Sequence, residues 1–153
     1  MPQDNPTWAK FLIGYYGLLQ TLHILVLIRA GAILLLEGGS PFPILPPPGG
    51  WVEQTMPFLV GLGITDSVGI LLGMVFAGQF FVKKRFNRRL GVISLTMFIT
   101  GAVVFAIGTF PSGAWADHTI AYGVMALLFI PTPILYTRLL TSNLKRVQPA
   151  DPS

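Results

Sequence analysis

Four long apolar stretches, separated by short segments rich in charge, glycine or proline, dominate the pattern along the chain. They cover about residues 11–36, 57–82, 90–110 and 118–140. Each is near or above the roughly 20 residues with which a helix crosses a hydrocarbon core of about 30 Å. Each is also far longer than an ordinary strand and continuously apolar. The pattern predicts an all-α membrane protein, folded as a four-transmembrane-helix antiparallel bundle.

Composition supports this class of protein. The 153 residues are 52% hydrophobic and only 10% charged, whereas roughly a quarter of the residues in soluble domains are charged. We expect residues 1–10 to form a short cytoplasmic segment, residues 11–140 the transmembrane domain and residues 141–153 a polar cytoplasmic tail. The absence of cysteine excludes a disulfide framework and thiolate metal sites.

Basic residues indicate which ends of the helices face the cytoplasm. All of them except Arg29 lie beside a predicted span: Lys10, Lys83, Lys84, Arg85, Arg88, Arg89, Arg138, Lys145 and Arg146. The positive-inside rule then places both termini and the loop at residues 83–89 in the cytoplasm. We expect a multi-pass protein of the plasma (inner) membrane. Its partners are the lipid bilayer and other transmembrane helices, and nucleic acid is not among them.

The loop after the first predicted helix differs from the basic loop. Residues 38–50 are dominated by glycine and proline, which end the helix and favour a stiff, extended path. Phe42, Ile44, Leu45 and Trp51 make this loop apolar. Two interpretations remain open: a lid lying on the bundle, or a docking surface for a partner.

Arg29 and Asp66 are the only charged residues inside their apolar stretches. Arg29 lies seven residues before Leu36, and Asp66 lies nine residues after Pro57. At 1.5 Å per residue, both sit roughly 10–14 Å from the same side of the membrane. We therefore expect an ion pair between the first two helices, serving either as a structural clasp or as a ligand site.

Small residues follow the same helix at intervals of four. Thr65, Gly69, Gly73 and Ala77 form a stripe of the kind that lets membrane helices approach closely. Three of them lie within about 60° of the direction of Asp66, so we expect Asp66 to face another helix.

The first helix carries a polar stripe of its own. Tyr16, Gln20 and His23 share one face, and Arg29 points about 120° away from His23. These residues, with Arg29 and Asp66, are the candidate ligand-binding groups. No cofactor is predicted outright, although His23 has the chemistry of a single axial ligand to haem or chlorophyll and Gln20 that of a hydrogen-bond partner to a quinone. His118 lies roughly 20 Å away in depth, which excludes a haem held by both histidines.

Pro131 and Pro133 fall near the middle of the fourth apolar stretch. Proline lacks a backbone N–H and clashes with the preceding turn, so we expect a kink there. The carbonyls that it frees must find other donors.

No classical catalytic signature occurs in the chain, so no catalytic residue is predicted. One hypothesis is a non-catalytic accessory or structural subunit of a membrane complex or homo-oligomer. The alternative is a ligand-binding bundle: a transporter, a lipid- or isoprenoid-type enzyme, or a pigment or quinone site using Arg29, Asp66 and His23.

Overall fold

The computed structural model describes residues 6–37, 45–51 and 55–141, and all regular elements within these ranges are helical. In chain order they are α1 (Thr7–Glu37), α2 (Thr55–Phe81), α3 (Arg88–Thr109), the 3-10 turn η1 (Phe110–Ser112), α4 (Ala114–Asp117), α5 (Thr119–Phe129) and α6 (Pro131–Thr141). The expected all-α fold is confirmed for the described part of the chain.

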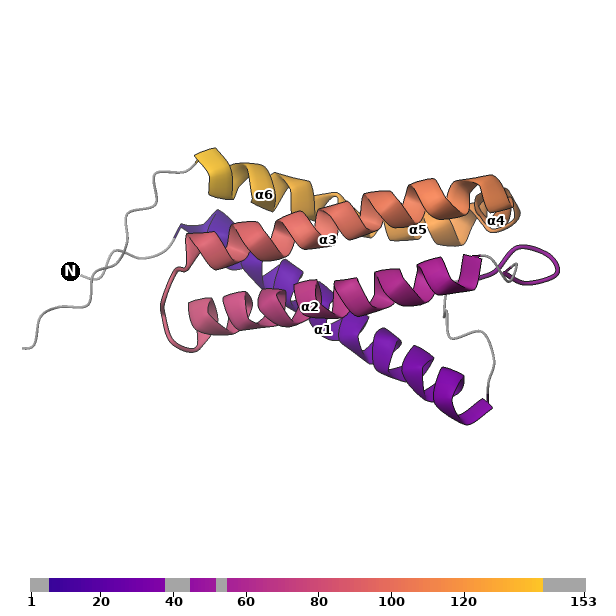
Figure 1. The fold of residues 1–153 in the computed structure, drawn as a ribbon. Helices are drawn as coiled ribbons and strands as arrows, with labels where there is room; N and C mark the ends of the chain where they lie inside the picture. Colours follow the sequence, from indigo (N-terminus) through magenta and orange to yellow (C-terminus); the bar gives the residue numbers. More distant parts are fainter. Residues whose placement is uncertain (1–5, 38–44, 52–54, 142–153) are drawn as a thin grey trace, which may run out of the picture.

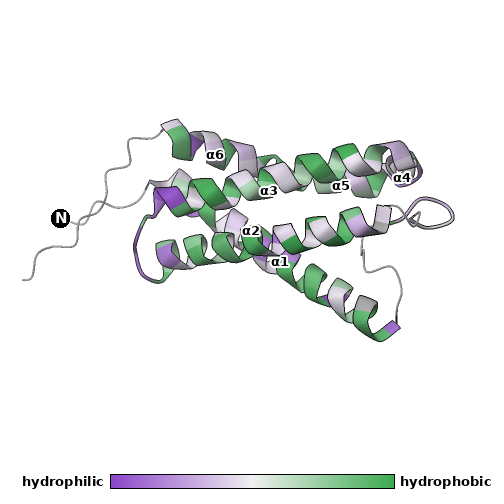
Figure 2. Ribbon diagram, viewed as in Figure 1, coloured by the Kyte–Doolittle hydropathy of each residue, from purple (hydrophilic) through white to green (hydrophobic). Residues whose placement is uncertain are grey.

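Among the described residues, four helical segments are long and apolar enough to cross a membrane: Thr7–Glu37, Pro57–Phe81, Arg88–Ser112 and Thr119–Thr141. Each one coincides with an apolar stretch of the sequence, to within a few residues at either end. Figure 2 shows apolar residues along the length of these helices and hydrophilic residues concentrated near their ends. The number of long apolar helices was therefore predictable from hydropathy alone.

The helices do not all pack together along their whole length (Figure 1). α2 and α3 lie side by side, while α1 packs against α2 and α6. A Cβ atom on Gly17 would lie only 2.8 Å from that of Ala77, so α1 and α2 touch closely there. In its second half α1 diverges gradually from the other helices, and its Leu25, Ile28 and Leu35 side chains are exposed.

Two separate groups of side chains form the interior. The larger one joins α1, α2, α3 and α6. The smaller one consists of Leu59, Phe105, Ala114 and Tyr122. The members of the larger cluster are Ala9, Ile13, Tyr16, Phe76, Ala77, Phe80, Leu95, Phe98, Leu135 and Leu139.

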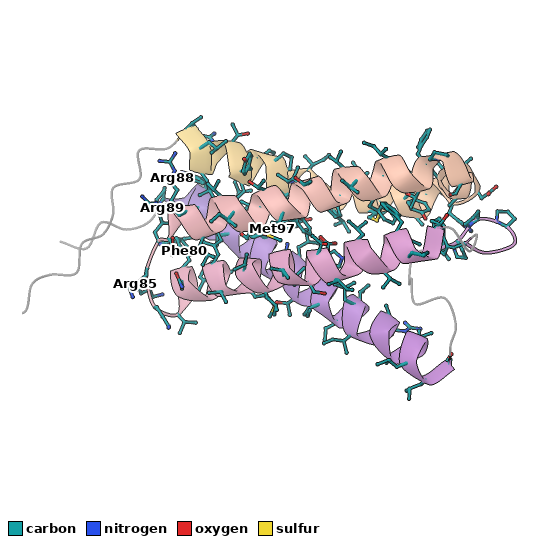
Figure 3. All side chains as sticks on the ribbon, in the orientation of Figure 1. Phe80, Arg85, Arg88, Arg89 and Met97 are labelled. Atoms are coloured by element: carbon teal, nitrogen blue, oxygen red, sulfur yellow. The ribbon has the colours of Figure 1, made fainter. Side chains whose placement is uncertain are left out.

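The end of the bundle that carries residues 83–89, called the basic end below, is closed by polar contacts. Figure 3 shows Arg85, Arg88 and Arg89 gathered there, around the start of α3. Arg88 donates a hydrogen bond to the carbonyl of Leu140 at the end of α6. Asn87 accepts one from the backbone N–H of Leu90 and so caps the first turn of α3. The Arg88 contact holds α3 and α6 together at this end.

The fourth long helix is interrupted, as the two prolines predicted. α5 ends at Phe129 and α6 begins at Pro131. Pro133 has no N–H for the carbonyl of Phe129, which instead accepts a hydrogen bond from the hydroxyl of Thr132 at 2.7 Å. The neighbouring carbonyl of Leu128 accepts one from the Tyr15 hydroxyl of α1 at 2.6 Å. The carbonyl of Leu127, which Pro131 deprives of its helical donor, accepts the backbone N–H of Ile130 at 3.2 Å. The break is therefore satisfied by one backbone donor and two side-chain hydroxyls.

Residues 45–51 lie against the opposite end of the bundle. The Tyr122 hydroxyl donates to the carbonyl of Leu45 at 3.0 Å, and Nε2 of His118 lies 3.0 Å from the carbonyl oxygen of Pro46. This part of the loop is bound to α5, as the lid interpretation expected. The expectations for residues 38–44, including Phe42 and Ile44, and for the tail beyond Thr141 lie outside the described residues.

Candidate ligand-binding site

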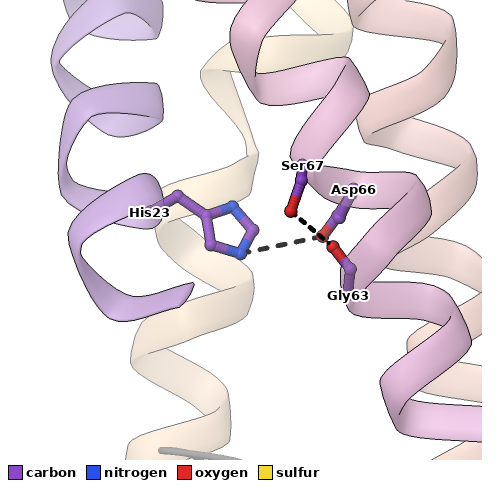
Figure 4. A network of polar contacts seen from close by, with 4 residues as sticks. All are labelled: His23, Gly63, Asp66 and Ser67. Carbon is purple, nitrogen blue, oxygen red and sulfur yellow. Dashed lines mark hydrogen bonds and ion pairs between the residues drawn. The ribbon is translucent and has the colours of Figure 1, made fainter. Parts of the chain in front are cut away.

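Asp66 of α2 faces His23 of α1 (Figure 4). Nε2 of His23 lies 3.7 Å from Oδ2 of Asp66, and the two side chains are only 25% and 16% exposed. Ser67, next to Asp66, donates its hydroxyl to the carbonyl of Gly63 at 2.8 Å and so does not compete for the carboxylate. The edge of the Phe98 ring packs against the imidazole, with ring centroids 5.9 Å apart. A carboxylate and an imidazole thus meet among apolar side chains.

The expected ion pair between Arg29 and Asp66 is not formed. Both residues belong to the described part of the chain, where Asp66 approaches His23 and Arg29 is exposed. The physical reason is the way α1 is rotated about its own axis and tilted relative to α2. His23 and Arg29 point about 120° apart on α1, so only one of them can face α2. α1 also turns away from α2 in the half that carries Arg29, which removes that side chain from the reach of Asp66.

A cavity of about 580 Å³ opens beside the His23–Asp66 contact. It lies between the two interior clusters, and its walls come from α1, α2, α3, α4, α5 and the first turn of α6. His23 and Asp66 are the ionisable groups among the described residues that line it. The rest of the lining is almost wholly apolar: Leu19, Leu22, Val26, Leu27, Leu62, Gly63, Phe98, Ile99, Gly101, Ala102, Val103, Phe105, Ala106, Trp115, Met125, Ala126, Leu128, Phe129, Ile130, Thr132 and Pro133.

A second hollow of about 630 Å³ lies on the other side of α2 and α3, and Asp66 borders this one as well. Its lining includes the exposed threonines Thr65, Thr96 and Thr100. Gly101 lines both spaces, and a Cβ atom there would lie 2.6 Å from Oδ1 of Asp66. The missing side chain of Gly101 therefore provides the room in which the carboxylate sits between the two spaces.

Tyr16 and Gln20 continue the polar stripe of α1 toward the basic end. Both are fully buried, and neither the Tyr16 hydroxyl nor the two polar atoms of the Gln20 amide has a hydrogen-bond partner among the described residues. They adjoin Gly73 of α2, where a Cβ atom would lie 2.9 Å from the Tyr16 hydroxyl oxygen. Buried polar groups are normally satisfied by protein or by ordered water, so this stripe has unused hydrogen-bonding capacity.

The stripe of small residues on α2 serves two neighbours. Gly73 and Ala77 face α1, whereas Gly69 faces α3, where its Cβ would lie 3.1 Å from that of Met97. Thr65 is exposed and donates its hydroxyl to the carbonyl of Gly61 at 3.0 Å. Three of the four residues of the stripe therefore pack against helices of the same chain.

A metal centre built from several side chains is not present in the described part of the chain, where no three His, Cys, Asp or Glu residues come together. His23 is the one imidazole on the cavity wall, and its Nε2 faces Asp66. A haem or chlorophyll metal bound at this nitrogen would have to take the place of the carboxylate contact.

Reasoning from sequence missed the contribution of α3. None of its residues was among the predicted site residues, yet Gly101 shapes the space around Asp66 and Phe98 supports His23. Residues 90–109 of this helix carry no charge, so no charged residue indicated its part in the site. A glycine level with an intramembrane carboxylate was the available signal.

Comparison of the chain with protein-family models, with curated proteins and with solved structures found no match in any of the three.

Proposed function

We propose that this is an integral membrane protein that binds a small amphipathic, membrane-soluble molecule inside its helix bundle. One observation carries the proposal: the cavity of about 580 Å³ is lined by apolar side chains except near the paired His23 and Asp66. Its volume falls in the range of roughly 300–1,000 Å³ typical of small-molecule sites. An apolar body would lie along the Leu, Val and Phe side chains, with a polar head at His23 and Asp66.

The chemistry of the pair constrains the head group. A neutral imidazole offers one donor and one acceptor, and a carboxylate oxygen accepts hydrogen bonds. A hydroxyl, phenol or amide group can donate to Asp66 while accepting from His23. A quinol, a prenyl alcohol or a similar lipid meets this requirement, whereas a hydrocarbon without a polar head would exclude water from Asp66 and offer it no hydrogen-bond donor.

The proposed setting is an antiparallel four-helix bundle in the plasma membrane, with both termini and the basic end in the cytoplasm. The charge distribution supports this orientation, because the described basic residues other than Arg29 lie toward one end of the bundle. The cavity then lies in the outer half of the bilayer, where a lipid-like molecule reaches it from the side.

Purification in mild detergent, followed by mass spectrometry of the co-purifying molecules, tests the proposal. We expect one amphipathic species to be retained by the natural protein and by Asp117→Asn, which changes an exposed carboxylate outside the cavity. Asp66→Asn and His23→Leu should lose it while remaining folded. Equal retention by all four proteins, or the same bulk lipids in each, would count against a specific site.

The non-catalytic role as a subunit of a complex or homo-oligomer is the second candidate. A specific feature favours it: Arg29 is exposed on a helix long and apolar enough to span a membrane. An arginine facing lipid is costly, and such residues are usually paired with another group or reach the interface.

A further inference from the structure

We propose that Arg29 of one copy of this chain pairs with Asp66 of a second copy, through the hollow between α2 and α3. This inference does not depend on the ligand in the inner cavity. It starts from two charges of opposite sign that do not meet within one chain. Arg29 is exposed on the diverging half of α1, and Asp66 borders a hollow that opens on the face of α2 and α3 away from that cavity.

Arg29 and Asp66 lie at similar heights along their predicted spans. Arg29 lies eight residues before the end of the span Thr7–Glu37, and Asp66 lies nine residues after the start of Pro57–Phe81. At 1.5 Å per residue these positions are about 12 and about 14 Å from the same side of the membrane. Two copies standing side by side in one bilayer keep their depths, so the charges meet at one level.

The hollow suits an incoming guanidinium group. The exposed side chains of Thr65, Thr96 and Thr100 border it, and their hydroxyl oxygens can accept hydrogen bonds from a guanidinium group. Oδ2 of Asp66 approaches His23, while Oδ1 lies over Gly101, which lines the hollow. A carboxylate with a neutral imidazole on one side keeps its negative charge available for an arginine on the other.

The positions of the charges favour a second copy of this chain as the molecule that fills the hollow. In lipid, apolar helix faces gain little by association alone, so complementary polar groups decide which surfaces meet. Each copy supplies one arginine and one acidic hollow, and the diverging half of α1 is free to reach beyond its own bundle (Figure 1).

The absence of cysteine makes a cross-linking test direct. One tagged copy carries Ile28→Cys, beside Arg29, and a differently tagged copy carries Thr100→Cys in the hollow. We expect oxidation to join the two copies in bilayers. Leu127→Cys is the matched control, because Leu127 is 66% exposed against 62% for Ile28 and lies on α5. It should not cross-link to Thr100→Cys.

Charge neutralisation in one copy at a time identifies the pair. Arg29→Gln in the Ile28→Cys copy, or Asp66→Asn in the Thr100→Cys copy, should lower cross-linking about tenfold, which corresponds to roughly 1.4 kcal/mol. In a head-to-tail contact, the same substitutions exchanged between the copies should leave cross-linking unchanged; in a reciprocal contact they remove the second Arg29–Asp66 pair and should lower it as well. Leu25→Gln in the Ile28→Cys copy, an exposed position on the same helix, should leave cross-linking unchanged in both cases. Absence of the cross-link, or no loss from either charge neutralisation, would overturn the proposal and assign Arg29 to lipid or to another protein.

Discussion

The imidazole of His23 and the carboxylate of Asp66 approach each other to 3.7 Å across the interface of α1 and α2. Both side chains are largely buried, and both border the apolar cavity. An ionisable group in such surroundings is costly unless it is paired, so each residue reduces the cost of the other. A substitution of either residue is therefore expected to change both the free energy of unfolding of the bundle and the binding of a ligand in the cavity.

A double-mutant cycle of His23→Leu and Asp66→Asn should reveal coupling between the two positions. Polar contacts between membrane helices contribute about 0.6 kcal/mol on average and up to about 1.7 kcal/mol. We expect a coupling free energy in that range, measured by unfolding in detergent. Losses that add to within about 0.3 kcal/mol would mean that the two groups do not interact.

Gly101→Ala should destabilise the protein, because its methyl group would lie 2.6 Å from Oδ1 of Asp66 and force the carboxylate to move. Overpacking of this kind costs about 1–3 kcal/mol, which the gain in helix propensity of up to about 1 kcal/mol offsets only in part. Gly123→Ala is the matched control, since nothing lies within 4 Å of a Cβ atom there. It should be neutral or should stabilise α5 by up to about 1 kcal/mol. Thermal unfolding in detergent compares the two variants, and an equal response would contradict the close fit at Gly101.

The adjacent residues Tyr15 and Tyr16 should respond oppositely to replacement by phenylalanine. Tyr15→Phe removes a 2.6 Å hydrogen bond to the carbonyl of Leu128 and should cost about 1 kcal/mol. Tyr16→Phe removes a fully buried hydroxyl without a partner in the described structure, so the free energy of unfolding should stay constant or rise. A clear loss of stability for Tyr16→Phe would instead indicate that this hydroxyl bonds an ordered water or the nearby Ser94 side chain.

Thr132→Val should weaken the break between α5 and α6. The Thr132 hydroxyl is buried and supplies the hydrogen bond that Pro133 denies to the carbonyl of Phe129. Leaving a buried carbonyl unpaired costs about 1–3 kcal/mol. Thr137→Val serves as the control, because Thr137 is exposed and its hydroxyl bonds a carbonyl four residues earlier that the helix itself can satisfy. Similar losses for both threonines would argue against the compensation at Phe129.

Single-cysteine labelling should establish the orientation in the membrane. Lys83→Cys lies at the basic end and Asp117→Cys at the opposite end, and both positions are exposed. A membrane-impermeant maleimide should label Asp117→Cys on intact cells and Lys83→Cys only after permeabilisation. The reverse pattern would place the basic end outside and contradict the positive-inside rule for this chain.

Much of the architecture could be predicted from the hydropathy, the charges and the positions of the prolines in the sequence. A span must satisfy its backbone internally, so a long apolar run in lipid can only be helical, and its length can be counted from residues. The break at Pro131 and Pro133 followed in the same way, because a missing N–H is a property of the residue itself. The two polar donors that compensate it, Tyr15 and Thr132, could not be chosen without the packing of the helices.

The sequence by itself determined that Asp66 is an intramembrane carboxylate near small residues, and that Tyr16, Gln20 and His23 share a face of α1. Only the tertiary structure decided that the partner of Asp66 is His23. Counting residues measures height along a helix, but it gives neither the tilt nor the rotation of one helix against another. α1 spans 31 residues against 25 for the span in α2, and it diverges after its crossing, so equal counts along the two helices do not bring two side chains together.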